Sequence, residues 1–147
     1  MYGFNVANIQ EGGLGTLGQE QLDLLEKDVK GISPSTPVVL FAHIPLWAVY
    51  PQWGGTDDAE RALSFVKRFG SVTVLNGHIH QVMQKVDGNI TFHTAMGTAF
   101  PLPTPGSVPK PIPVVVQATQ LKKMLGLTSV NYTETNHTLA IVDSTLA

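Results

Sequence analysis

Two short, largely apolar runs, rich in β-branched side chains, dominate the hydrophobic pattern of this chain. The first covers 37–42 and the second, which includes Thr73, covers 72–75. Each predicts a strand that is covered on both faces. Weaker apolar segments predict a further strand within 4–9 and a last strand near 139–142.

The segment before the first of these runs has the periodicity of a helix. Apolar residues recur with helical spacing and predict an amphipathic helix over about 18–30. Thr16, followed three residues later by Gln19, fits a capping box at its start. Gly31 and Pro34 are typical residues for the segment after a helix. The periodic apolar positions are Leu22, Leu25 and Val29.

A second helix is predicted between the two apolar runs. Thr56 fits its N-cap, acidic residues follow at the positive end of the helix, and Gly70 marks its end. A short third helix is predicted at about 117–125. The apolar stripe of the second helix consists of Ala59, Leu63, Val66 and Phe69.

The order of these elements predicts an α/β fold, with a mixed sheet, flanking helices and a β-hairpin. Two short strands, about 82–86 and 90–94, flank Asp87-Gly88, which is a typical hairpin turn. Residues 101–113 hold six of the ten prolines and predict a semi-rigid extended loop. The loop is a candidate lid or a surface crossover.

Composition narrows the classes of function. The 147 residues carry a formal net charge of −2, and their charges are scattered, so no patch for nucleic acid and no membrane-binding helix is predicted. The apolar runs are too short for a transmembrane helix. The chain has no cysteine, which excludes disulfides and thiolate metal sites but leaves the compartment unknown.

Histidines follow both predicted buried strands. His43 stands in Ala42-His43-Ile44-Pro45, directly after the first, and Asn76-Gly77-His78-Ile79-His80 follows the second. Histidines at strand ends can converge, and imidazole suits zinc, iron and manganese-type sites. The positions of these histidines therefore make a metal centre the leading hypothesis. Two metals about 3.5–4 Å apart can activate water and clamp a phosphoryl group.

These motifs resemble the C-terminal half of the calcineurin-like metallophosphoesterases. The stretch Leu14–Glu26 is similar to the helix that precedes the isolated histidine in that family. The resemblance implies that His43 and His78 bind one metal and His80 the other. It further implies two divalent metals of the Mn, Fe or Zn class in the complete enzyme, and a phosphate-ester small molecule as the substrate.

The upstream half of the family pattern is absent from this sequence. Asp-x-His, Gly-Asp-x-x-Asp and Gly-Asn-His-Asp/Glu do not occur, so no catalytic residue is assigned with certainty in this chain. The resemblance implies that 1–147 is a single partial domain, half of a four-layer αββα sandwich, whose full-length relatives are often exported from bacteria. We therefore expect weak metal binding and little hydrolysis. A homo-oligomer or a missing N-terminal half would cover the open side.

Two alternatives to a binuclear phosphoesterase stay open. One is a non-catalytic remnant or interaction domain with the same fold, and the other is a mononuclear three-histidine hydrolase. Asn76, Trp47 and His93 are candidates for a substrate pocket, although a tight turn, core packing and a structural histidine explain them equally simply. His137 is expected in a surface turn.

Overall fold

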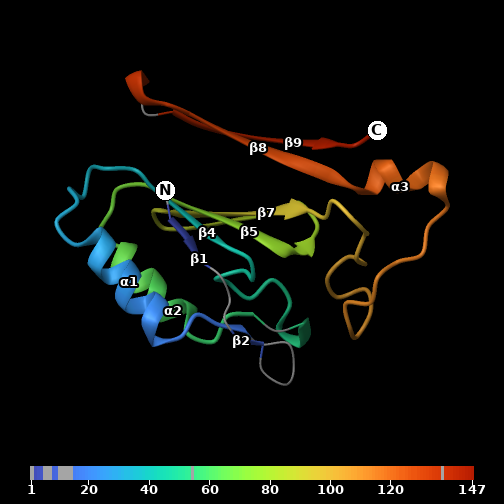
Figure 1. The fold of residues 1–147 in the computed structure, drawn as a ribbon, viewed down its shortest axis with the longest axis horizontal. Helices are drawn as coiled ribbons and strands as arrows, with labels where there is room; N and C mark the ends of the chain where they lie inside the picture. The colour runs from blue at the N-terminus through green and yellow to red at the C-terminus, as the bar shows by residue number, and fades with distance from the viewer. Residues whose placement is uncertain (1, 5–7, 10–14, 54, 137) are drawn as a thin grey trace.

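The computed structural model describes residues 2–4, 8–9, 15–53, 55–136 and 138–147. Within these residues a five-stranded sheet forms the centre of the molecule, in the order β1-β4-β5-β7-β6 (Figure 1). The first four strands are parallel to their neighbours, and β6 runs antiparallel to β7. The strand bounds are β1 Tyr2–Phe4, β4 Val38–Ala42, β5 Val72–His80, β6 Met83–Asp87 and β7 Ile90–Met96.

Two helices, α1 (Gln19–Val29) and α2 (Ala59–Val66), cover one face of this sheet (Figure 1). Their apolar stripes meet the inward residues of β4, β5 and β7, and together they form the main hydrophobic core. Burial of this kind stabilises a fold by roughly 1.5–3 kcal/mol for each large apolar side chain. The least exposed members of the core include Leu40, Ala62, Val66 and Val74.

A β-hairpin lies over the opposite face of the sheet. It consists of β8 (Gly126–Thr133) and β9 (Thr138–Thr145), and Figure 1 shows it crossing above β5 and β7. The described residues thus stack in three layers, with helices, sheet and hairpin. The remaining elements are β2 Asn8–Ile9, β3 Gly15–Thr16, α3 Ala118–Met124 and the short 3-10 helices Pro51–Trp53 and Glu134–Asn136.

One buried histidine joins the hairpin to the sheet. His93 on β7 is 2% exposed, and its Nε2 lies 3.1 Å from Oδ1 of Asp143 on β9. The hydroxyl of Thr128 on β8 donates to the same carboxylate oxygen at 2.6 Å. Gln84 on β6 supplies the other partner, with its amide nitrogen 3.0 Å from Nδ1. Because an amide N–H₂ only donates, Nδ1 accepts and Nε2 donates to Asp143.

Most of the expected elements are confirmed. The helix expected at 18–30 is α1, the helix at 117–125 is α3, and residues 101–113 form neither helix nor strand. The strand expected within 4–9 falls partly outside the described residues, which contain only β1 and β2 there. Strand β8 was not predicted from the sequence. Its outward-facing positions are largely polar, so its pattern of apolar residues is weak.

Three local expectations are corrected. Strand β5 does not end at Leu75 but continues to His80, with an irregularity in its pairing to β7 after Asn76. In the hairpin Asp87 pairs with Ile90, so the turn consists of the next two residues and not of Asp87-Gly88. The second helix ends at Val66, before the predicted stop, although Phe69 is buried as expected.

Both predicted helix caps are wrong, and Asp58 explains why. Its carboxylate accepts hydrogen bonds from the Thr16 hydroxyl at 3.0 Å and from the backbone N–H groups of Leu17 and Gly18 at 3.0 and 2.9 Å. Thr16 is therefore engaged with Asp58, and the N-cap positions belong to Gly18 and Asp58, neither with a side-chain capping bond. One carboxylate thus ties the start of α1 to the start of α2.

The chain is a mixed α/β protein in its described residues, with three α-helices, a mixed sheet and a separate antiparallel hairpin. None of these helices is long and apolar enough to cross a membrane. The carboxyl ends of the parallel strands β4 and β5 meet at one edge of the sheet, and both histidine motifs stand there.

The stability contributed by Asp58 should depend on pH. Burial alone would raise the pKa of this carboxyl, but the bonds from Leu17, Gly18 and Thr16 outweigh it and bring the pKa below its usual 3.8. The ionised form then stabilises the folded state above that value, and the contribution is lost as pH falls through the folded-state pKa. We expect Asp58→Asn to lower the free energy of unfolding more at about pH 6 than at about pH 2.

Urea denaturation of the wild type and the variant at both pH values measures this effect. Glu134→Gln, in an exposed turn, serves as the control and should show no such pH dependence. An equal loss for Asp58→Asn at both pH values would contradict the assignment.

The hairpin anchor gives a second prediction. Asp143→Ala removes the acceptor for both His93 and Thr128 and leaves a buried imidazole N–H without its partner, which costs roughly 1–3 kcal/mol. We expect faster amide hydrogen exchange throughout β8 and β9, with little change in β4. Ser129→Ala, on the outer face of the same hairpin, is the matched control, and equal exchange in the two variants would disprove the anchoring role of Asp143.

Candidate metal centre

The parallel register of β4 and β5 brings the two histidine motifs together. Ala42 is paired with Asn76, and the N–H of Gly77 donates to the carbonyl of His43 at 3.1 Å. His43 therefore lies beside the last part of β5, which carries His78. The predicted proximity of the isolated histidine and the histidine pair is present in the structure.

Asn76 fastens the ends of the two strands to each other. Its Nδ2 donates to the carbonyl of Ala42 at 2.9 Å, and the side chain is 5% exposed. Its Oδ1 is buried and has no hydrogen-bond partner among the described residues. The amide thus positions the residue before His43, through a side-chain bond added to the backbone pairing.

Gly77 gives the His43 ring room to approach the backbone. A Cβ at this position would lie 3.3 Å from Nδ1 and 3.6 Å from Cε1 of His43. The contact with Nδ1 is tighter than ordinary van der Waals packing, whereas the contact with Cε1 is ordinary, so a side chain here would require the ring to shift by a few tenths of an ångström. The glycine is therefore needed for close approach rather than for an unusual dihedral angle.

Both histidines of the pair adopt a left-handed backbone conformation. The φ angles are 67° at His78 and 58° at His80. This region is uncommon for residues with a Cβ and costs on the order of 1–3 kcal/mol at each position. Strained backbone of this kind clusters at functional sites, so its occurrence at both histidines marks this turn as a candidate site.

The imidazole rings of His43 and His78 are in contact. Their ring centroids are 5.3 Å apart, and the ring planes meet at 79°. Burial of the ring, followed by repulsion from His43 and His80, lowers the pKa of His78 below its usual 6.5. Neutral imidazole is the form that binds metals, so the environment of His78 favours the ligand form at neutral pH.

His80 is oriented by the backbone of the loop that follows β7. Its Nδ1 lies 2.7 Å from the carbonyl oxygen of Phe100, and its ring packs against the Phe100 ring in a tilted arrangement, with 4.7 Å between centroids and 50° between planes. A carbonyl only accepts, so Nδ1 donates and Nε2 keeps its free lone pair. Histidine ligands of metals commonly show this pattern. Gly97 provides the space, since a Cβ there would lie 2.5 Å from Nδ1 of His80.

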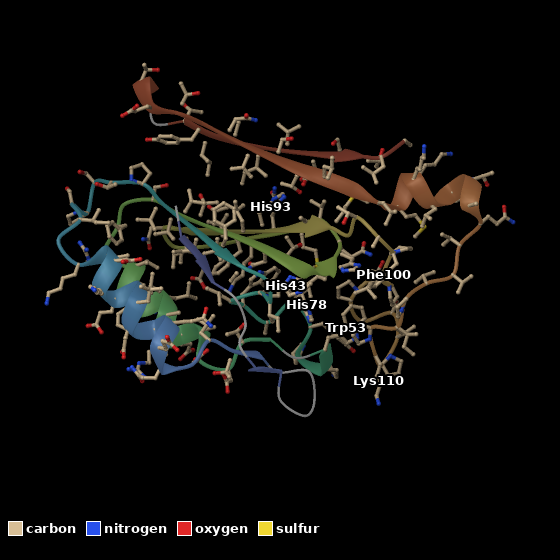
Figure 2. All side chains as sticks on the ribbon, viewed as in Figure 1. His43, Trp53, His78, His93, Phe100 and Lys110 are labelled. Atoms are coloured by element: carbon tan, nitrogen blue, oxygen red, sulfur yellow. The ribbon has the colours of Figure 1, made fainter. Side chains whose placement is uncertain are left out.

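The three imidazoles share one cavity of about 300 Å³. Figure 2 shows His43, His78, Trp53 and Phe100 gathered at the same end of the sheet. In the described residues, however, no three side chains of His, Cys, Asp or Glu form a group that could hold a metal ion. The other lining residues are Trp53, Ile79, Phe100, Leu102, Pro111 and Pro113.

The residues considered for a substrate pocket divide between two other cavities. Asn76 and His93 line one of about 320 Å³, under the hairpin, which also reaches His43. Trp47 lines neither histidine cavity. It packs near Phe92, with ring centroids 6.1 Å apart, beside a cavity of about 630 Å³ near α2. His137 lies outside the described residues.

Trp53 and Phe100 are the site residues that the sequence revealed least clearly. Trp53 belongs to the aromatic loop after His43, but nothing in the sequence separates it from Trp47. Phe100 comes from the segment just before the proline-rich loop, where no motif marks it. Only the folded loops show which of these side chains face the histidines.

Comparison with known proteins adds no assignment. No family model matches this chain, and a search of curated proteins found no match.

The close approach at Gly77 provides a test of the site geometry. We expect Gly77→Ala to weaken Mn²⁺ or Zn²⁺ binding by about tenfold, because the new methyl group displaces the His43 ring. Isothermal titration calorimetry measures the affinity, and thermal denaturation checks that the fold is kept. Gly55→Ala is the matched control, since a Cβ there meets nothing within 4 Å. Equal affinities of the two variants would show that metal binding does not depend on the close approach of the His43 ring to Gly77.

Proposed function

We propose that this chain is the C-terminal part of a binuclear-metal phosphoesterase of the calcineurin-like type, which hydrolyses phosphomonoesters, phosphodiesters or nucleotides. The observation that carries the proposal is the meeting of His43, His78 and His80 in one cavity at the carboxyl ends of two parallel strands. Ligand sites of open α/β sheets lie in this position.

The layering of the chain fits half of a four-layer sandwich. The helices cover one face of the mixed sheet and the hairpin covers the other, so β8 and β9 correspond to the start of a second sheet. Strand β1 is at the edge of the central sheet within the described residues. A missing N-terminal half, or a second copy of the chain, would pair with this edge.

The chemistry of the donors fits a transition metal in part. Three neutral imidazoles suit Zn²⁺, Mn²⁺ or Fe²⁺, and His80 presents a free Nε2. None of the residues lining the cavity is acidic, so no lining carboxylate balances the charge of two dications. We therefore expect the isolated chain to bind metal weakly and to hydrolyse little.

In the complete enzyme the metals would generate hydroxide near neutral pH and stabilise charge on the phosphoryl oxygens. Hydrolysis forms a bond from the water oxygen to phosphorus and breaks the ester P–O bond, and the alcohol leaves with a proton. The residues of this chain would position the reacting group by holding imidazole nitrogens at fixed places. The Asn76 and Phe100 contacts described above restrict those nitrogens.

Metal titration of single-histidine variants tests the proposal. We expect His43→Ala and His78→Ala each to reduce the affinity for Mn²⁺ by at least about tenfold, because each removes a ligand nitrogen. His93→Gln is the control for loss of an imidazole, since both nitrogens of His93 are already hydrogen-bonded and cannot bind a metal. Circular dichroism verifies the fold of every variant.

The outcomes separate the proposed function from its alternatives. Unchanged affinity in both His43→Ala and His78→Ala would refute the metal site and favour a non-catalytic remnant or interaction domain. That reading draws support from the absence of acidic residues in the lining of the cavity. One tightly bound metal per chain, lost also in His80→Ala, would instead indicate a mononuclear three-histidine site. Tight binding of two metals by the isolated chain would contradict the weak binding expected here.

A further inference from the structure

The proline-rich segment forms a fixed wall of the histidine cavity. The amide of Gln81 donates to the carbonyl of Leu102 at 2.7 Å, and the indole N–H of Trp53 donates to the carbonyl of Val108 at 3.2 Å. The N–H of Val114 donates to the carbonyl of Pro101 at 3.0 Å. The first two bonds join the start and the middle of the segment to other parts of the molecule, and the third closes the segment by joining its two ends to each other. The wall is therefore preorganised, with little ordering cost when a ligand binds.

This wall is apolar and partly aromatic. Every lining residue apart from the three histidines is aromatic, aliphatic or proline, and none carries a charge. Trp53 is 5% exposed and Leu102 is 8% exposed, whereas Phe100 is 42% exposed and its ring packs at a tilt against His80. Lys110, a cation of the same segment, does not line the cavity and extends away from the histidines in Figure 2.

Few polar groups of the cavity are left to form hydrogen bonds with a ligand. The indole N–H of Trp53 is already used by Val108, and Nδ1 of His80 is used by Phe100. Recognition of a base or a sugar needs placed donors and acceptors, and the lining outside the histidines offers no further polar side chain. An apolar group buried against these walls gains binding free energy without such partners.

We infer that the cavity selects phosphate esters whose organic group is small, uncharged and apolar, with an aryl group as the best fit. This inference rests on the proposed function, because the histidines must hold the phosphoryl end. The organic group then lies against Trp53, Phe100 and the prolines of the wall. At about 300 Å³ the cavity matches the lower end of the size range of small-molecule sites.

Phosphonates that cannot be hydrolysed test the selectivity directly. Isothermal titration calorimetry with the full chain and saturating Mn²⁺ compares phenylphosphonate, methylphosphonate and adenosine monophosphate. We expect phenylphosphonate to bind at least about tenfold more tightly than methylphosphonate, because the ring buries apolar area against the wall. Adenosine monophosphate should bind more weakly than phenylphosphonate.

Phe100→Ala identifies the wall as the source of this selectivity. The variant removes the ring and its contact with His80 but keeps the carbonyl that accepts from His80. Because the change can alter the affinity for both phosphonates, the measured quantity is their ratio, and we expect the preference for phenylphosphonate over methylphosphonate to fall. Val115→Ala is the matched control, since Val115 follows the same segment, is 99% exposed and does not line the cavity.

Failure of the inference can be distinguished from failure of the proposed function. If Mn²⁺ binds through the histidines but phenylphosphonate and methylphosphonate bind equally, or Phe100→Ala keeps the preference, the apolar selectivity is overturned and the metal site stands. Tighter binding of adenosine monophosphate than of phenylphosphonate also overturns it. If Mn²⁺ does not bind, the proposed function fails, and the inference falls with it.

Discussion

The parallel pairing of β4 with β5 is the constraint on which the arrangement of histidines depends. It places the residues after the two strands side by side, and the Asn76 amide and the Gly77 N–H extend the pairing beyond the regular ladder. A shift of one residue in this register would turn the strand faces over and separate His43 from His78. The core beneath the sheet therefore supports the site, because it determines which residues face the helices.

The loops around the site depend on bonds between elements that are distant in sequence. Asp58 links the starts of the two helices, and the aromatic loop between β4 and α2 is connected to the proline-rich segment through Trp53. Proline limits the number of unfolded conformations, and the hydrogen bonds select one of them. A segment without helix or strand thus has a defined position beside the histidines.

Sequence patterns predicted the parts of the fold that depend on residues close together in the sequence. The continuous runs in β4 and β5 and the periodic stripe of α1 depend on local spacing, and all three elements are present. The cap of α1 was predicted wrongly because a carboxylate more than 40 positions from Thr16 accepts a hydrogen bond from its hydroxyl. Strand β8 was missed because its burial comes from the sheet beneath it and its own sequence is largely polar.

The same division applies to the candidate site. The proximity of His43 and His78 follows from the order of buried strands, which the sequence reveals. The contact of His80 with the Phe100 carbonyl and the separate location of Trp47 depend on how loops fold back, which no local pattern records. Pocket residues on loops are therefore the least predictable part of the site.

The left-handed backbone at His78 and His80 means that a substitution which stabilises the fold at these positions can also remove an imidazole of the candidate metal site. Glycine would adopt these φ angles without a steric penalty, so replacing either histidine with glycine relieves the backbone strain at that position. The same exchange deletes an imidazole from the cavity. A redesign that selects only for stability of the folded state would therefore replace these two histidines and remove their imidazoles from the site.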